Sequence, residues 1–158
     1  MREEIIRMAV EAGRISAERS ARDAFKATER RLYAVPDLRA KLRDDQEELE
    51  DIQLFISEGN SFQPEDIRAV IIDLEAAIAA TSHELEALDK ALASIRDDLY
   101  YLAVYGKYIQ RMSDEEIAKK IFELFEWDMP CHPTTIWKNR KRLVQRVAVR
   151  LYGAYAVK

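Results

Sequence analysis

A heptad pattern of apolar residues runs through residues 67–102 and limits the possible folds of this chain more than any other feature. Its members are separated alternately by four and three residues: Ile67, Ile71, Leu74, Ile78, Thr81, Leu85, Leu88, Leu92, Ile95, Leu99 and Leu102. A helix places residues of this spacing along one stripe, so the pattern predicts a coiled coil. At about 1.5 Å per residue the stripe is roughly 50 Å long, and other helices or a second chain must cover it.

The chain as a whole is poor in residues that make turns. Its 158 residues include only 4 Gly and 4 Pro, whereas Ala, Glu, Lys, Leu and Arg together make up close to half of the sequence. Sheet-based folds need Gly and Pro at regular intervals. The composition therefore excludes such folds and predicts an all-α protein built from long helices.

Two more helices are expected before the long stripe. The first covers about residues 3–34 and should break or kink at Val35-Pro36, because the residue before a proline is pushed out of helical geometry. The second, about residues 37–57, carries its own heptad stripe with one polar member, Asp45. A loop over residues 57–64 would let it fold back antiparallel over the long stripe. Residues 1–97 are therefore predicted to form a helical hairpin that mediates oligomerisation, most simply as a dimer.

The sequence also predicts a soluble, cytoplasmic protein with no membrane partner. No stretch approaches the roughly 18 uncharged apolar residues that span a bilayer. Three of the first four residues, Arg2, Glu3 and Glu4, are charged, unlike the start of a signal peptide. The single cysteine, Cys131, excludes a disulfide framework within the chain and fits a reducing compartment.

Charge is distributed very unevenly along the chain. The net charge is only −4, but residues 134–158 carry seven basic side chains and no acidic one. Residues 36–133 carry a large excess of acids. Such asymmetry matters more for function than the total, and it points to a nucleic-acid partner for the C-terminal segment.

Three helical segments are predicted over residues 98–158, the first of which continues the long stripe through Leu99, Leu102, Ala103 and Ile109. Ser113 and Glu116 have the spacing of a capping box, which marks a helix start. A final helix, residues 133–152, begins at Pro133, a residue that suits the first helical position. Its apolar stripe comprises Ile136, Leu143, Val147 and Leu151. The opposite face is cationic and polar without any acid: Thr134, Thr135, Lys138, Lys141, Arg142, Gln145 and Arg146.

A basic outer face on the last of three short helices is typical of a helix-turn-helix DNA reader. Residues 98–158 are therefore predicted to form a DNA-binding domain. The first turns of the last helix would enter the major groove of double-stranded DNA, where Lys or Arg can donate to guanine and Gln can pair with adenine. Cations nearer its C-terminal end would bind phosphates.

The motifs Ser-Asp-Glu-Glu-Ile-Ala-Lys-Lys at 113–120 and Thr-Thr-Ile-Trp-Lys-Asn-Arg-Lys-Arg-Leu-Val at 134–144 resemble region 4 of sigma factors. They most resemble the ArpU/RinA-type regulators of phage late transcription, as does the upstream segment 27–36. The resemblance implies a sequence-specific regulator of phage or prophage genes that contacts host RNA polymerase. The connection between residues 121 and 134 is longer than in such readers, so either the middle helix is extended or a loop is inserted.

Alternative interpretations remain for the chain and for single residues. Small terminase subunits of phage DNA packaging also join a helix-turn-helix to coiled helices, and a plain coiled-coil interaction protein is a third class. The sequence offers no catalytic constellation and too few His and Cys for a metal site, so we expect neither an enzyme nor a cofactor. Arg140 is expected to pair with Glu115 or Glu116. Trp137 is expected at the edge of the small domain's core, with packing on a phosphate or base as the alternative. The nearby tyrosines are expected to pack next to the core, with a stacking platform for single strands as the alternative.

Overall fold

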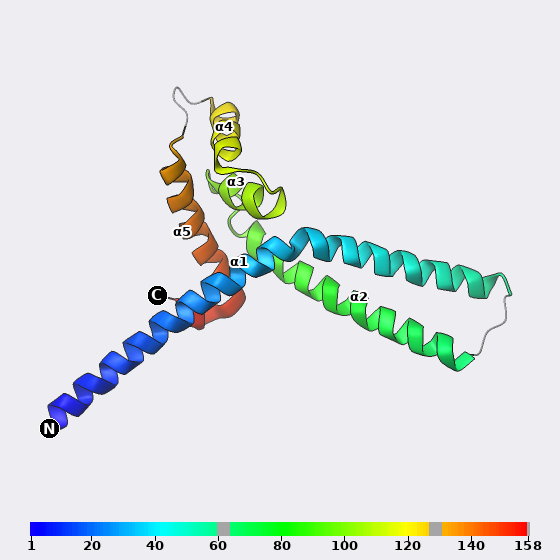
Figure 1. The fold of residues 1–158 in the computed structure, drawn as a ribbon, viewed down its shortest axis with the longest axis horizontal. Coiled ribbons are helices and arrows are strands. Elements are labelled where there is room, and N and C mark those ends of the chain that lie inside the picture. Colours follow the sequence, from blue (N-terminus) through cyan, green and yellow to red (C-terminus); the bar gives the residue numbers. More distant parts are fainter. Residues whose placement is uncertain (60–63, 127–130, 158) are drawn as a thin grey trace. The chain divides into compact units, whose positions relative to one another are not determined.

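A computed structural model describes residues 1–59, 64–126 and 131–157, and this part of the chain is helical without strands (Figure 1). The all-α prediction is therefore confirmed. The α-helices are α1 (Arg2–Ser57), α2 (Pro64–Ala93), α3 (Tyr101–Val104), α4 (Asp114–Phe125) and α5 (Pro133–Tyr152). A π-helical turn, η1 (Tyr105–Ile109), follows α3, and a 3-10 turn, η2 (Gly153–Ala156), follows α5.

The chain divides into two compact units, and α1 contributes to both. Residues 34–89 form one unit, which we call the hairpin unit. Residues 1–33 group with residues 90–158 in the other, which we call the C-terminal unit. The predicted domain boundary between residues 97 and 98 does not coincide with this division, because the first part of α1 groups with the C-terminal helices.

Of the two expectations for Val35-Pro36, a break or a kink, the break is wrong, because α1 continues through Pro36 as one helix of 56 residues. Proline inside a helix removes one backbone hydrogen bond and costs roughly 3 kcal/mol. Leu32 and Val35, in the turn before it, are fully buried. Burial of two such side chains contributes about 1.5–3 kcal/mol each, which is enough to keep this turn helical.

In the hairpin unit, the second part of α1 and α2 run antiparallel (Figure 1). The two heptad stripes are only partly buried, because Leu42 and Leu49 are half-buried and Ile56 is 43% exposed. Leu74, Leu85 and Leu88 are buried. The polar member of the shorter stripe, Asp45, is also buried, and its carboxylate accepts from Lys41 Nζ at 2.9 Å. The two helices are further joined by an ion pair of 3.3 Å between Arg39 and Asp89.

The helix predicted through Leu102 ends earlier, because α2 stops at Ala93. Ser94 Oγ donates to the Ala91 carbonyl at 2.6 Å, and the Asp98 carboxylate accepts from the Tyr100 N–H at 2.9 Å. Short polar side chains of this kind compete with helical hydrogen bonds and favour turns. Leu99, a predicted member of the stripe, is 40% exposed as a result.

The C-terminal unit has its own core between α3, α4 and α5. Ala103 of α3, Ile117 and Ile121 of α4, and Ile136 of α5 are fully buried in one cluster. Gly106 in η1 allows a close approach here, since a Cβ at this position would lie 3.2 Å from Ile117 Cγ1. The buried cluster fixes α4 and α5 against each other, which determines the surface that α5 exposes.

The predicted starts of α4 and α5 are both confirmed. Ser113 Oγ accepts from the Glu116 N–H at 3.2 Å, and the serine hydroxyl donates to the Glu116 carboxylate at the same distance. α5 begins at Pro133, and the Thr134 N–H donates to His132 Nδ1 at 3.1 Å. α4 extends to Phe125 and ends at Glu126 with φ of 50°. The rest of the long connection, residues 127–130, lies outside the described residues.

Candidate nucleic-acid interface

α5 buries one face and exposes most of the predicted DNA-contacting face. Its buried side chains are Ile136, Arg140, Leu143, Val144, Val147 and Ala148. This agrees with the stripe inferred from the sequence, because residues spaced three and four apart share a helix face. Of the predicted contact residues, Thr134, Lys138, Lys141, Arg142 and Arg146 are exposed, whereas Thr135 and Gln145 are half-buried.

Two exposed cations, Lys138 and Lys141, lie in the first half of α5. No carboxylate in the described part of the chain pairs with Lys138 or Lys141. Lys141 Nζ lies 4.6 Å from the centroid of the Trp137 ring, which is a cation–π distance. Trp137 is 49% exposed, so about half of its surface is open to solvent. These side chains are available to a ligand outside the protein.

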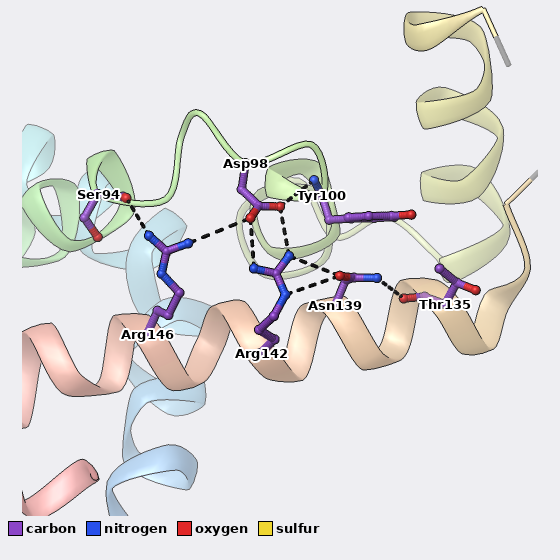
Figure 2. Close-up of polar contacts among 7 residues, drawn as sticks. All are labelled: Ser94, Asp98, Tyr100, Thr135, Asn139, Arg142 and Arg146. Atoms are coloured by element: carbon purple, nitrogen blue, oxygen red, sulfur yellow. Dashed lines mark hydrogen bonds and ion pairs between the residues drawn. The ribbon is translucent and has the colours of Figure 1, made fainter.

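Arg142 and Arg146, in contrast, are held by one acid from outside the helix. Figure 2 shows the Asp98 carboxylate between the two guanidinium groups. Arg142 donates to it twice, at 2.9 and 3.1 Å, and Arg146 Nη1 lies 3.8 Å away. The Arg142 hydrogen bond lowers the pKa of Asp98 below its usual value, and the pKa of Arg142 is raised in turn. Both arginines therefore fix α5 to the segment that follows α2.

Two more of the predicted contact residues have partners within the protein. The Gln145 side-chain amide donates to the Ala156 carbonyl in η2. The Thr135 carbonyl accepts from Asn139 Nδ2 at 2.9 Å, and Asn139 Oδ1 accepts in turn from Arg142 (Figure 2). Gln145 is thus tied to η2 as Arg142 and Arg146 are tied to Asp98, whereas the Thr135 bond is made by its backbone within α5.

Arg140 is a structural residue, as expected, but with a different partner. Its guanidinium is 3% exposed and donates to the Ala103 carbonyl at 2.7 Å and to the Asp114 carboxylate. Asp114 is the first residue of α4, so its carboxylate lies nearer to the core than those of Glu115 and Glu116, which are exposed. The predicted pairing with Glu115 or Glu116 is therefore wrong, and Arg140 joins α3, α4 and α5.

The first part of α1 packs against α5 and was not foreseen as part of the site. Ala24 of α1 and Ala148 of α5 belong to one buried cluster together with Ala156 of η2. Tyr108 in η1 donates its hydroxyl hydrogen to Glu29 of α1 at 2.7 Å. Burial and this carboxylate raise the pKa of Tyr108 far above its usual value. The packing interpretation of the tyrosines is confirmed for Tyr108, which is 1% exposed.

A cationic groove lies between α1 and α5. Its volume is about 410 Å³, and it is lined by Arg22, Phe25, Lys26, Lys141, Arg142 and Gln145. None of these lining residues is acidic, and four are cationic. The sequence signal for this groove was weak, because the cations of residues 1–35 are interleaved with almost as many acids.

The described residues indicate neither a metal site nor a membrane-spanning helix. They contain no group of three or more His, Cys, Asp or Glu residues placed to hold a metal ion. None of their helices is both long and apolar enough to cross a membrane. Comparison with protein families, curated proteins and solved structures finds no match to this chain. Function must therefore be inferred from the surface of α5 and its surroundings.

Proposed function

We propose that this protein is a sequence-specific DNA-binding regulator of transcription, in which α3, η1, α4 and α5 act as a helix-turn-helix unit. The observation that carries the proposal is the exposed start of α5, where Lys138 and Lys141 have no acidic partner in the described residues. Like the phage regulators that its sequence resembles, the protein would act on phage or prophage promoters, in contact with host RNA polymerase.

The contacts of α5 divide the predicted residues into two roles. Thr134 and Lys138, in the first two turns, would contact base edges in the major groove, where a lysine donates to guanine O6 and N7. Lys141, one turn further, would bind a backbone phosphate. We assign a positioning role to Arg142, Gln145 and Arg146, since their side chains already bind Asp98, Ala156 and Ser94.

We expect the double substitution Lys138→Ala and Lys141→Ala to weaken DNA binding about tenfold at 0.1 M salt. Loss of the Lys141 phosphate contact should also lower the slope of log K against log salt concentration by about one, since Lys138 is assigned to a base edge. Fluorescence anisotropy with a 30-base-pair duplex of random sequence, measured from 50 to 200 mM salt, tests this. The control is Arg43→Ala with Arg68→Ala, which removes two exposed cations from the hairpin unit. Equal affinities for the two double variants would contradict the assignment of α5.

The proposal also states that the protein forms a dimer and recognises a defined DNA motif. Residues 1–19 of α1 expose Ile5, Ile6, Met8, Val10 and Ile15, which is a large apolar surface for a single helix. We therefore expect a dimer by native mass spectrometry at micromolar concentration, and a defined motif from selection on a pool of random duplexes. A monomer at high micromolar concentration would refute the dimer. A ring of eight or more chains that selects no motif would favour a DNA-packaging protein instead.

A further inference from the structure

We infer that the groove between α1 and α5 is a phosphate-binding site, which the DNA backbone occupies when the start of α5 enters the major groove. This inference rests on the proposed function for its ligand, but it concerns residues of α1 that lie about 110 positions before α5 in the sequence. Its cationic elements are Arg22 and Lys26 on α1 and Lys141 on α5. Arg142 also lines the groove, but its guanidinium is held by Asp98.

Three cations that line the groove have no acidic partner in the described part of the free protein. Arg22 and Lys26 are four residues apart on the same face of α1, and like charges at this spacing destabilise a helix. No carboxylate in the described part of the chain pairs with either side chain. Lys141 faces the same hollow from α5. An anion in the groove would reduce the electrostatic repulsion within each pair of these cations, which are Arg22, Lys26 and Lys141.

The position of the groove beside α5 indicates where such an anion would come from. A helix in the major groove is flanked by two phosphate backbones, because the groove is only about 12 Å wide. The α1 cations lie along one flank of α5, and Lys141 borders both the groove and the exposed start of α5. A backbone phosphate on this flank would therefore meet Arg22, Lys26 and Lys141 together.

The helices that carry the groove cations are held in place by buried contacts. Ala24 of α1 is buried in one cluster with Ala148 of α5 and Ala156 of η2. The hydrogen bond from Tyr108 to Glu29 fixes α1 one turn further along. Phe25 forms the apolar part of the lining and is half-buried. The cations therefore extend from a fixed framework, so little order must be gained on binding.

The test compares two double variants. The groove variant carries both Arg22→Gln and Lys26→Gln, and the control variant carries both Arg2→Gln and Arg7→Gln. Both variants remove two exposed cations from α1, but Arg7 lies about 22 Å along the helix from Arg22. We expect the groove variant to bind a random duplex about tenfold more weakly at 0.1 M salt, with a salt slope lower by about 1.8. The control should bind within twofold of the wild type.

A second measurement separates the groove from the proposed function. Tripolyphosphate should raise the melting temperature of the wild type and of the control, and should raise that of the groove variant by less than half as much. If the groove variant binds DNA like the wild type while the α5 double variant does not, the DNA proposal stands and this inference is overturned. If the wild type binds no DNA but tripolyphosphate acts as described, the phosphate site stands with a free polyphosphate as its ligand. If tripolyphosphate also has no selective effect, the site is overturned.

Discussion

Replacement of Arg140 by alanine is expected to lower the free energy of unfolding of the C-terminal unit by about 3 kcal/mol. The substitution removes two hydrogen bonds and leaves the carbonyl of Ala103, a residue that is itself fully buried, without its donor. An unsatisfied buried carbonyl costs roughly 1–3 kcal/mol, and the loss of the packed aliphatic stem adds to this. Urea denaturation followed by circular dichroism measures the change.

Two further variants separate the charge of Arg140 from its volume. Arg140→Met keeps most of the volume and should lose about half as much stability, because Nη1 is buried without a hydrogen-bond partner among the described residues. Arg150→Ala removes an exposed arginine from the same helix and should change stability by less than about 0.5 kcal/mol. If Arg140→Ala is no more destabilising than Arg150→Ala, Arg140 does not join the three helices as inferred.

The local features of the fold could be predicted from the sequence because their signals are local. Ser113 with Glu116 marks the start of α4, and Pro133 marks the start of α5, by hydrogen bonds within one turn. The apolar stripe of α5 follows from helical periodicity alone. These rules determine which face of α5 is buried, and so they also predicted that Lys138 and Lys141 would be exposed.

The partners of the exposed face could not be predicted, because they come from distant parts of the chain. Asp98, which binds Arg142, is 44 residues away and reaches it only because α2 ends at Ala93. The heptad stripe runs through residue 93 without interruption, so its pattern predicted a helix where the chain turns. The continuation of α1 past Pro36 is a second tertiary effect, since burial of Leu32 and Val35 outweighs a local preference.

The Asp98–Arg142 pair leads to an expected result in which DNA affinity and stability change in opposite directions. Asp98→Asn should free Arg142 and Arg146 and remove one fixed negative charge beside α5. We expect the affinity for a random duplex to rise about 30-fold at 50 mM salt, since two cations become available to phosphates. The free energy of unfolding should fall by about 1 kcal/mol, a small value because both arginines are about half exposed.

The matched control for this prediction is Asp97→Asn, which makes the same charge change at an exposed neighbour. A general electrostatic effect would raise DNA affinity equally in both variants, and that result would contradict a specific role of Asp98 in holding the arginines. The pH dependence gives an independent check. Because the folded pKa of Asp98 is lowered from about 3.8, its stabilising contribution is present above this pH and is lost as the pH falls through the folded value. The wild type should therefore lose stability below pH 3.8 more steeply than Asp98→Asn, while Asp97→Asn should follow the wild type.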